Sequence, residues 1–286
     1  MDNEIAIRLA CFFGVFISIA IWEWILPRRI LTTSKSKRWF ANLGIVVLNS
    51  FLVRVLIPVM PVGVALFFQK NGWGVLNTLN LPYPVMVIAG VIALDFVIYL
   101  QHVMFHAVPL FWRFHMMHHA DLDYDLTTGL RFHPIEIIIS IGIKLTVVAA
   151  LGPPPLAVIV FEILLNATAT FNHGNIYLPG FLDRFLRMFV VTPDMHRVHH
   201  SVIIRETNCN FGFNLPWWDR LFGTYRSQPI AGHKEMTIGL SQFRDSRELN
   251  LPRMLLLPFA GNPGNYAINR WGKEPELKDV KESDLK

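Results

Sequence analysis

Eight of the eleven histidines lie in three short clusters that share a simple spacing rule. The first cluster has the pattern H-x-x-x-H, and the second and third both have the pattern H-x-x-H-H. The eight residues are His102, His106, His115, His118, His119, His196, His199 and His200. Residues three and four apart share one face of a helix, so each cluster is expected to aim two or three imidazole rings at one point. Because neutral imidazole is the commonest metal ligand and eight donors exceed what one ion takes, the pattern predicts two metal ions held by histidine alone.

The other three histidines stand alone. His173, in Asn-His-Gly-Asn, ends an apolar stretch level with the clusters and is predicted to be a ninth ligand. His133 precedes Pro134, which suits a first helical turn, and is expected beside the ligands or facing the substrate rather than on a metal. His233 lies in a polar segment and is expected to be solvated.

The identity of the metal is not fixed by these residues. Imidazole suits iron, zinc, copper and nickel. The Glu-x-x-His pairs of soluble di-iron helix bundles do not occur near the clusters. A zinc-dependent membrane lipid hydrolase and a non-catalytic metal-binding or transport protein therefore stay open as alternatives. A b-type haem protein fits less well, because its two axial histidines form a pair across helices and not H-x-x-H-H triples.

The composition is that of a membrane protein. Of the 286 residues, 52% are hydrophobic and only 16% are charged, and the mean hydropathy is +0.38. The net charge of +5 comes without a basic stripe interleaved with aromatic residues, which argues against nucleic-acid binding. Two isolated cysteines, Cys11 and Cys209, exclude a disulfide framework and a thiolate metal site.

Five apolar stretches are predicted to form the membrane helices that position the histidines. They are Ile5–Leu26, Leu43–Phe68, Pro84–Phe105, Pro134–Leu151 and Leu156–Phe171. The first would be about 33 Å long as a helix, and it reads as a retained span rather than a signal peptide. The second contains Pro58 and Pro61, so it is either one kinked span or a span plus a re-entrant piece. The last two are joined by Gly-Pro-Pro-Pro and should form a hairpin.

Basic residues orient these spans. The loop after the first stretch contains Arg28, Arg29, Lys35, Lys37 and Arg38 and is therefore predicted to be cytoplasmic. Following the chain from this loop brings every histidine cluster to the same side. The predicted fold is all-α: a polytopic transmembrane bundle of about four to five spans with a cytoplasmic helical cap that holds a histidine-ligated dimetal site. A compact chain without an appended haem domain suggests a bacterial inner membrane.

Three regions are expected along the chain. Residues 1–83 form the N-terminal membrane spans, residues 84–227 form the catalytic domain, and residues 228–286 form a C-terminal interfacial segment and tail. Within the last region, Met254–Leu257 suits an interfacial position, and the charged end from Lys273 is expected to be disordered.

The ordered combination of motifs between about Ile88 and Arg226 resembles a known group of membrane enzymes. The positions are Asp95, His102-x-x-x-His106, Trp112-Arg113-Phe114-His115-x-x-His118-His119, Phe132-His133-Pro134-x-Glu136, Asn172-His173, Thr192-Pro193-x-x-His196-x-x-His199-His200 and Trp218-Asp219-x-Leu221-Phe222-Gly223-Thr224-Tyr225. Together they resemble the sterol desaturase / fatty acid hydroxylase superfamily. The resemblance implies two non-haem iron ions that activate O2 and hydroxylate or desaturate a lipid C–H bond.

By this resemblance the ligands would be His102, His106, His115, His118, His119, His173, His196, His199 and His200. Some members have a further histidine four residues after the position of His173, where this chain has Tyr177, so nine ligands are expected rather than ten. The lipid substrate and the choice between hydroxylation and desaturation stay open. Electrons should come from a separate reductase, ferredoxin or cytochrome b5-like donor, because the chain has no haem or flavin motif.

Four polar residues are candidates for orienting the ligand rings. They are Asp95, Asn172, Asp194 and Asp219. Asp95 continues the helical face of His102 and His106, and an aspartate inside an apolar span needs a partner. That partner is either the N–H of a ligand ring or a polar group on a packed helix.

Overall fold

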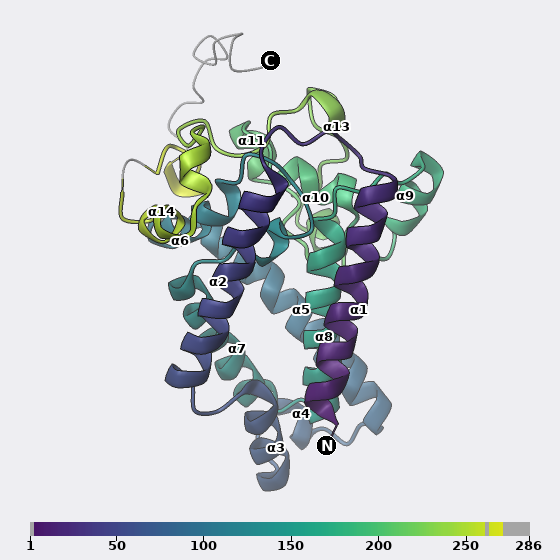
Figure 1. Cartoon of the computed structure of the whole chain (residues 1–286). Helices are drawn as coiled ribbons and strands as arrows, with labels where there is room; N and C mark the ends of the chain where they lie inside the picture. The colour runs from purple at the N-terminus through teal and green to yellow at the C-terminus, as the bar shows by residue number, and fades with distance from the viewer. Residues whose placement is uncertain (1–2, 261–262, 271–286) are drawn as a thin grey trace.

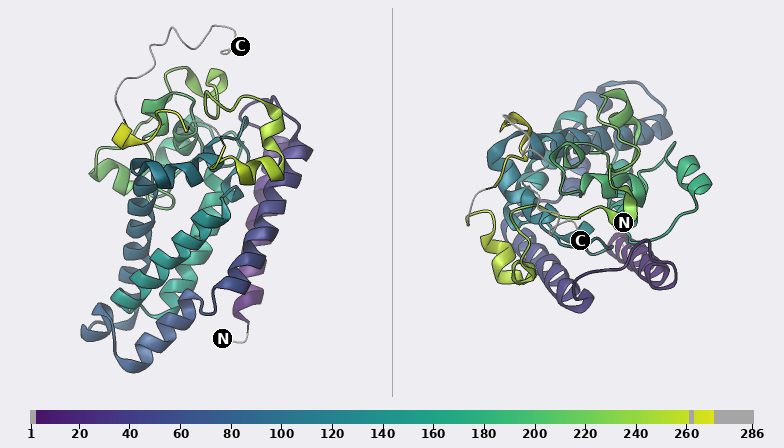
Figure 2. Two further views of the ribbon diagram at one scale, coloured as in Figure 1. Left: turned by 90° about the vertical axis from the view of Figure 1, so that its left-hand side faces the viewer. Right: turned by 90° about the horizontal axis from the view of Figure 1, so that it is seen from above.

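A computed structural model describes residues 3–260 and 263–270, and the charged tail from Lys273 lies outside them. The described residues form helices and loops, with two isolated β-bridges. Five helical segments are long and apolar enough to cross a membrane, as the sequence predicted. Figures 1 and 2 show these segments as an elongated bundle with a helical cap at one end. We use "cap" for residues 108–133, 173–260 and 263–270.

The first two long helices run in opposite directions along the bundle. α1 (Glu4–Ile25) leads toward the cap and α2 (Lys35–Leu56) leads away from it (Figure 1). α2 begins eight residues before the predicted apolar stretch, because polar residues in its first turns face a buried loop of the cap. Ser34 caps this helix by accepting a hydrogen bond from the Lys37 N–H.

The second apolar stretch contains two helices rather than one kinked helix. α3 (Pro61–Asn71) starts at a proline after the break that contains Pro58. α3 is too short to cross a bilayer, whereas α2 alone is about 33 Å long. The structure therefore contradicts a single kinked span and shows two helices, whereas the prediction that the second is re-entrant stays a prediction. α3 and α4 (Val75–Thr78) lie at the end of the bundle opposite the cap (Figure 1).

The central helices carry the chain up to the cap, down and up again. α5 (Tyr83–Ala107) ends in the cap and continues into α6 (Pro109–His119). α7 (Pro134–Leu151) and α8 (Pro155–Asn172) form the predicted hairpin. Gly152 ends α7 with a φ of +59°, and a side chain there would lie 2.4 Å from the Trp73 carbonyl, so only glycine fits this turn.

The rest of the cap consists of short helices linked by loops. They are η1 (Thr128–Leu130), α9 (Gly180–Leu186), α10 (Pro193–His199), α11 (Ile204–Thr207), α12 (Trp217–Leu221), α13 (Gly232–Glu235), η2 (Ser246–Leu249), α14 (Leu251–Leu256) and η3 (Ile268–Arg270). α14 lies within the segment predicted to be interfacial. Its Met254 is buried against α2 and α6, whereas Leu256 is 61% exposed.

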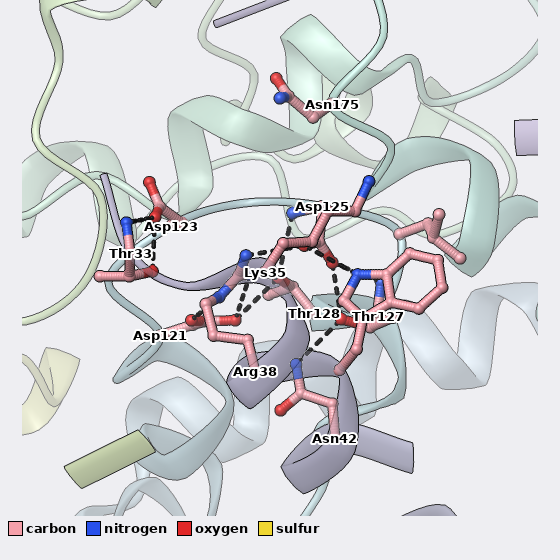
Figure 3. Close-up of polar contacts among 12 residues, drawn as sticks. Thr33, Lys35, Arg38, Asn42, Asp121, Asp123, Asp125, Thr127, Thr128 and Asn175 are labelled. Atoms are coloured by element: carbon pink, nitrogen blue, oxygen red, sulfur yellow. Dashed lines mark hydrogen bonds and ion pairs between the residues drawn. The ribbon is translucent and has the colours of Figure 1, made fainter. Parts of the chain in front are cut away.

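An acidic loop between α6 and α7 is anchored to α2 by one arginine (Figure 3). The buried Arg38 guanidinium donates to Asp121 at 2.7 and 2.8 Å and to Asp125 at 2.7 Å. Asn42, one turn along α2, donates to Thr127 at 3.0 Å. The third carboxylate, Asp123, accepts from the backbone N–H groups of Thr32 and Thr33. These contacts fix the loop that follows the first H-x-x-H-H box.

Candidate metal centre

The nine predicted ligands come together as two adjoining groups of donor atoms. The five-histidine group contains His102, His106, His115, His119 and His199. The four-histidine group contains His118, His173, His196 and His200. Within each group, one nitrogen per ring lies within 4.8 Å of all the others, and every ring is buried. Both groups could hold a metal ion, and both lie at the cap end of the bundle.

Each H-x-x-H-H box contributes to both groups. His115 and His119 join the five-histidine group, while His118 joins the four-histidine group. In the second box, His199 and His200 are likewise divided between the groups. In each box the two rings that are four residues apart, His115 with His119 and His196 with His200, share one group, so each box aims two rings at one point, within the two or three that the sequence predicted. Consecutive residues on a helix point about 100° apart, so neighbouring rings face different centres.

Backbone carbonyls fix the protonation of two rings in the five-histidine group. The Nδ1 of His102 lies 2.7 Å from the Phe211 carbonyl, and the Nδ1 of His199 lies 2.7 Å from the Cys209 carbonyl. A carbonyl can only accept, so both Nδ1 atoms carry the proton and both Nε2 atoms present lone pairs. These Nε2 atoms face each other at 3.1 Å. Two facing lone pairs repel unless a cation lies beside them, so the arrangement fits a metal ion.

Two further rings of the five-histidine group have side-chain partners that the sequence did not predict for this role. Glu136 accepts from the Nδ1 of His115 at 2.6 Å, and the Asn208 side-chain oxygen lies 3.0 Å from the Nδ1 of His106. Asn208 in turn donates to the Tyr266 carbonyl at 2.8 Å, which ties this ligand to the C-terminal part of the cap. Glu136 lies in the Phe-His-Pro-x-Glu motif, so the sequence offered it as a candidate partner of a ligand ring. No motif in the sequence indicates Asn208.

His173, the C-cap residue of α8, donates through Nδ1 to the Ala169 carbonyl one turn earlier at 2.7 Å. Its Nε2 lies 3.3 Å from the Nε2 of His118, inside the four-histidine group. The inner nitrogen of His106 and both ring nitrogens of His200 are buried without a partner in the described protein. Buried donors and acceptors are rarely left without a partner, so these nitrogens also fit metal binding.

Burial keeps the imidazoles neutral. It lowers the pKa of His115 and of His173 to about 3, from an ordinary value of 6.5. Burial and the neighbouring rings also place the pKa of His118 well below its ordinary range. Only the neutral ring offers a lone pair, so the site is prepared for ligation at neutral pH.

The predicted orienting residues do not touch the ligand rings. Asp95 accepts from the Trp218 indole at 2.8 Å, which is the helix-packing alternative rather than the ligand alternative. Asn172 donates to the Phe213 carbonyl at 3.1 Å. Asp219 accepts from the N–H groups of Phe211 and Gly212, each at 2.8 Å. Because the Phe211 carbonyl holds His102, Asp219 acts on that ring through the backbone.

Asp194 belongs to a polar network beside the centre. It is paired with Arg197 and with Arg28, which belongs to the loop after α1. Burial alone would raise the pKa of Asp194, but these two guanidinium groups lower it below its ordinary value. His233 lies 3.7 Å from the same carboxylate and is only 5% exposed, so the prediction of a solvated His233 was wrong.

The remaining two predicted positions lie outside the donor groups. His133 caps α7 by accepting from the Ile135 N–H, and its other ring nitrogen lies 3.3 Å from the Leu255 carbonyl. Tyr177 is 44% exposed and packs under the Arg28 guanidinium. The position of a tenth histidine in some relatives is thus at the surface here.

A cavity of about 410 Å³ leads from the five-histidine group into the membrane part of the bundle. It is lined by residues of α2, α5, α7 and α8, with His102 and His115 at the cap end. Lys144 and Glu162, paired at 3.0 Å, mark its other end. A molecule in this cavity would approach the histidines from the bilayer rather than from water.

Comparisons with known proteins agree with this arrangement. The sequence model of the fatty acid hydroxylase family matches residues 87–224. An ornithine lipid hydroxylase of Rhizobium tropici is 31% identical over 159 residues, covering 55% of this chain and 46% of the relative. Human alkylglycerol monooxygenase is 30% identical over 161 residues, covering 54% of this chain and 34% of the relative.

Rat cholesterol 25-hydroxylase is 26% identical over 156 residues, covering 54% of this chain and 50% of the relative. The chain thus spans half or less of the length of these relatives. No solved structure matches it significantly. Residues 87–224 of this integral membrane protein, slightly less than half of the chain, therefore match the fatty acid hydroxylase family, in line with the sterol desaturase / fatty acid hydroxylase superfamily that its histidine pattern resembles.

Proposed function

We propose that this chain is a membrane-bound di-iron oxygenase that hydroxylates or desaturates a C–H bond of a lipid. One observation carries the proposal: two buried, adjoining groups of imidazole donors lie at the end of a cavity that enters from the membrane bundle. The relatives are named as a monooxygenase and as hydroxylases of lipids. In hydroxylation, a C–H bond, O2, two electrons and two protons give C–OH and water.

The nine histidines would hold two iron ions, which supply O2 activation and hydrogen abstraction when bound. The chain positions the ligands through the Phe211 and Cys209 carbonyls and through Glu136. Phe105, Leu165 and Phe213 line the cavity and keep water from the reacting carbon. No side chain has to act as a general base, so the protein contributes position, exclusion of water and the environment of the metal.

The geometry favours this function over a zinc hydrolase. Zinc sites are almost always four-coordinate, with three protein ligands where they are catalytic. The five-histidine group offers five donors, and the Nε2 of His115 lies 3.1 and 3.2 Å from those of His102 and His119. Five protein donors exceed the three or four that a zinc site takes from the protein. A transport role fits less well, because transporters place ligands near the bilayer midplane rather than at one end.

We also propose that the cap faces the cytoplasm of a bacterial cell and takes electrons from a separate reductase, ferredoxin or cytochrome b5-like protein. The basic loop between α1 and α2 supports this orientation, because cytoplasmic loops are enriched in Lys and Arg. Arg28 of that loop contacts Asp194, so the loop and the histidines lie at the same end of the bundle. Residues 84–227 would form the catalytic domain, with residues 1–83 as N-terminal membrane spans and residues 228–286 as a C-terminal interfacial segment and tail.

The test combines metal analysis with isotope labelling. Protein purified without oxygen should contain two iron ions, and membranes given a reductase and 18O2 should hydroxylate a lipid with retention of one label, or consume O2 while desaturating it. His118→Ala and His199→Ala, one from each group, should lose iron and turnover. His233→Ala is the matched control and should keep iron. Zinc without iron, together with lipid turnover that needs no O2, would establish the hydrolase instead.

A further inference from the structure

The cavity below the five-histidine group contains buried hydrogen-bond acceptors that no protein group satisfies. Asn49, from α2, is 8% exposed and lines the cavity. Its amide nitrogen donates to the Phe132 carbonyl at 2.9 Å, which fixes the orientation of the amide because a carbonyl can only accept. Its Oδ1 has no partner within the described protein. Leaving a buried acceptor in this state is unfavourable, so a ligand that donates a hydrogen bond here would be stabilised.

A second acceptor lies beside a predicted metal ligand. Glu136 is 4% exposed, lines the same cavity and uses Oε1 to accept from the Nδ1 of His115. Its Oε2 has no partner within the described protein. Two acceptors with fixed orientation, Asn49 from α2 and Glu136 from α7, therefore border one cavity at the level of the histidines.

The polar lining continues away from the centre. Gln101, the residue before His102, donates to Ser140 at 3.0 Å, and its side-chain oxygen has no partner among the described residues. Lys144 lies one turn further along α7, and Glu162 binds both Lys144 at 3.0 Å and Arg8 at 2.8 Å. Glu136 and Lys144 are eight residues apart, or about 12 Å along the helix. A plain hydrocarbon chain would leave Asn49 Oδ1, Glu136 Oε2 and Gln101 Oε1 without a donor.

We propose that the cavity binds the hydrogen-bond-donating polar segment of a lipid, so that the carbon presented to the metal centre lies within a few bonds of a hydroxyl or N–H group. This proposal rests on the proposed function and assigns its substrate class. The lipid would donate to Asn49 Oδ1 and Glu136 Oε2, with Gln101 as an adaptable partner. The alkyl remainder would extend away from the acceptors toward the bilayer. Oxidation near the methyl end of an acyl chain is the alternative.

The position of the inserted oxygen tests the proposal. Cells of the native host, with and without the gene, are grown under 18O2, and labelled lipids are located and fragmented by tandem mass spectrometry. We expect the label within a few carbons of an O–H or N–H group. A label near the methyl end of a chain overturns the proposal and leaves the proposed function intact. Absence of any O2-dependent change in the lipids, with the protein fully loaded with iron, overturns the proposed function itself.

Two variants test the acceptors directly without touching a residue that contacts a ligand ring. Asn49→Leu and Gln101→Leu should each lower the yield of labelled lipid about tenfold, because a donor of the bound lipid is then buried without a partner. Iron content should stay at the wild-type level in both. Asn71→Leu is the matched control, because its amide also donates to a backbone carbonyl, that of Phe67, but outside the cavity. Unchanged yields in both cavity variants, or lost iron, would refute the assignment.

Discussion

Replacing Gly129 with alanine should displace one ligand of the four-histidine group. Gly129 belongs to η1, in the buried loop after the first box, and its Cα faces the end of α8. A Cβ at this position would lie 2.7 Å from the Ala169 carbonyl oxygen and 2.9 Å from the Nδ1 of His173. These two atoms form the hydrogen bond that orients the His173 ring. The added methyl group would therefore clash with both the Ala169 carbonyl oxygen and the His173 Nδ1, the two atoms of this hydrogen bond.

The size of the effect follows from these distances. Ordinary contacts of a Cβ begin at about 3.4 Å, so the ring or the backbone must give way by about half an ångström. α8 is packed and its backbone is hydrogen-bonded, so the ring is the part that moves. Loss of the partner of a metal-ligating histidine lowers metal affinity by about 10- to 100-fold. Overpacking costs a further 1–3 kcal/mol or so of stability.

The assay is iron per protein by mass spectrometry, with turnover and thermal unfolding measured on the same sample. We expect Gly129→Ala to lose iron from the four-histidine group, keep iron in the five-histidine group and lose turnover. Gly142→Ala is the matched control, because a Cβ at Gly142 in α7 meets nothing within 4 Å. Two retained iron ions and full turnover in Gly129→Ala would show that the contact with His173 does not matter.

Three further outcomes are expected. Glu136→Gln should weaken iron binding about 10- to 100-fold, measured by competition with a chelator, because His115 loses its carboxylate partner; unchanged affinity would count against that role. Arg38→Met should cost about 3–5 kcal/mol in detergent unfolding, because Asp121 and Asp125 are left buried without their cation, and a loss below 1 kcal/mol would contradict this account. Metal-free protein should unfold at a lower Tm at pH 5.5 than at pH 7.5. Burial lowers the folded pKa of His115 and of His173 to about 3, so the stability present above pH 6.5 falls as pH drops below it, by about 1.4 kcal/mol per unit for each ring. Equal Tm values would show that these rings are solvated.

The histidine clusters and the helices were predictable because both depend on local spacing. The H-x-x-H-H pattern identifies its members by type, and the apolar stretches with their prolines mark where helices start and stop. The hairpin followed from Gly152 and the prolines after it in the same way. The start of α2 was harder, because Arg38 and Asn42 are polar residues whose partners lie more than eighty residues away.

What could not be predicted was which group supports which ring. The Phe211, Cys209 and Ala169 carbonyls are backbone atoms, so no side-chain type signals them. Asp95 had a clear need for a partner, but its partner is Trp218, 123 residues away. His233 is buried because the cap folds over a polar segment, which composition alone does not reveal.

The support of His106 by Asn208, and of Asn208 by Tyr266, has a consequence for biogenesis. The predicted ligands are synthesised in order from α5 onward, yet Tyr266, which holds the partner of His106, is among the last described residues to leave the ribosome. Trp112 packs beside the His106 ring, and its indole N–H donates to the Pro263 carbonyl at 3.1 Å. This hydrogen bond can form only after Pro263 has been synthesised. Spans can therefore insert during translation, whereas iron is expected to enter only after release, when the C-terminal part of the cap closes over the site. A chain stopped before Pro263 should span the membrane and remain unmetallated.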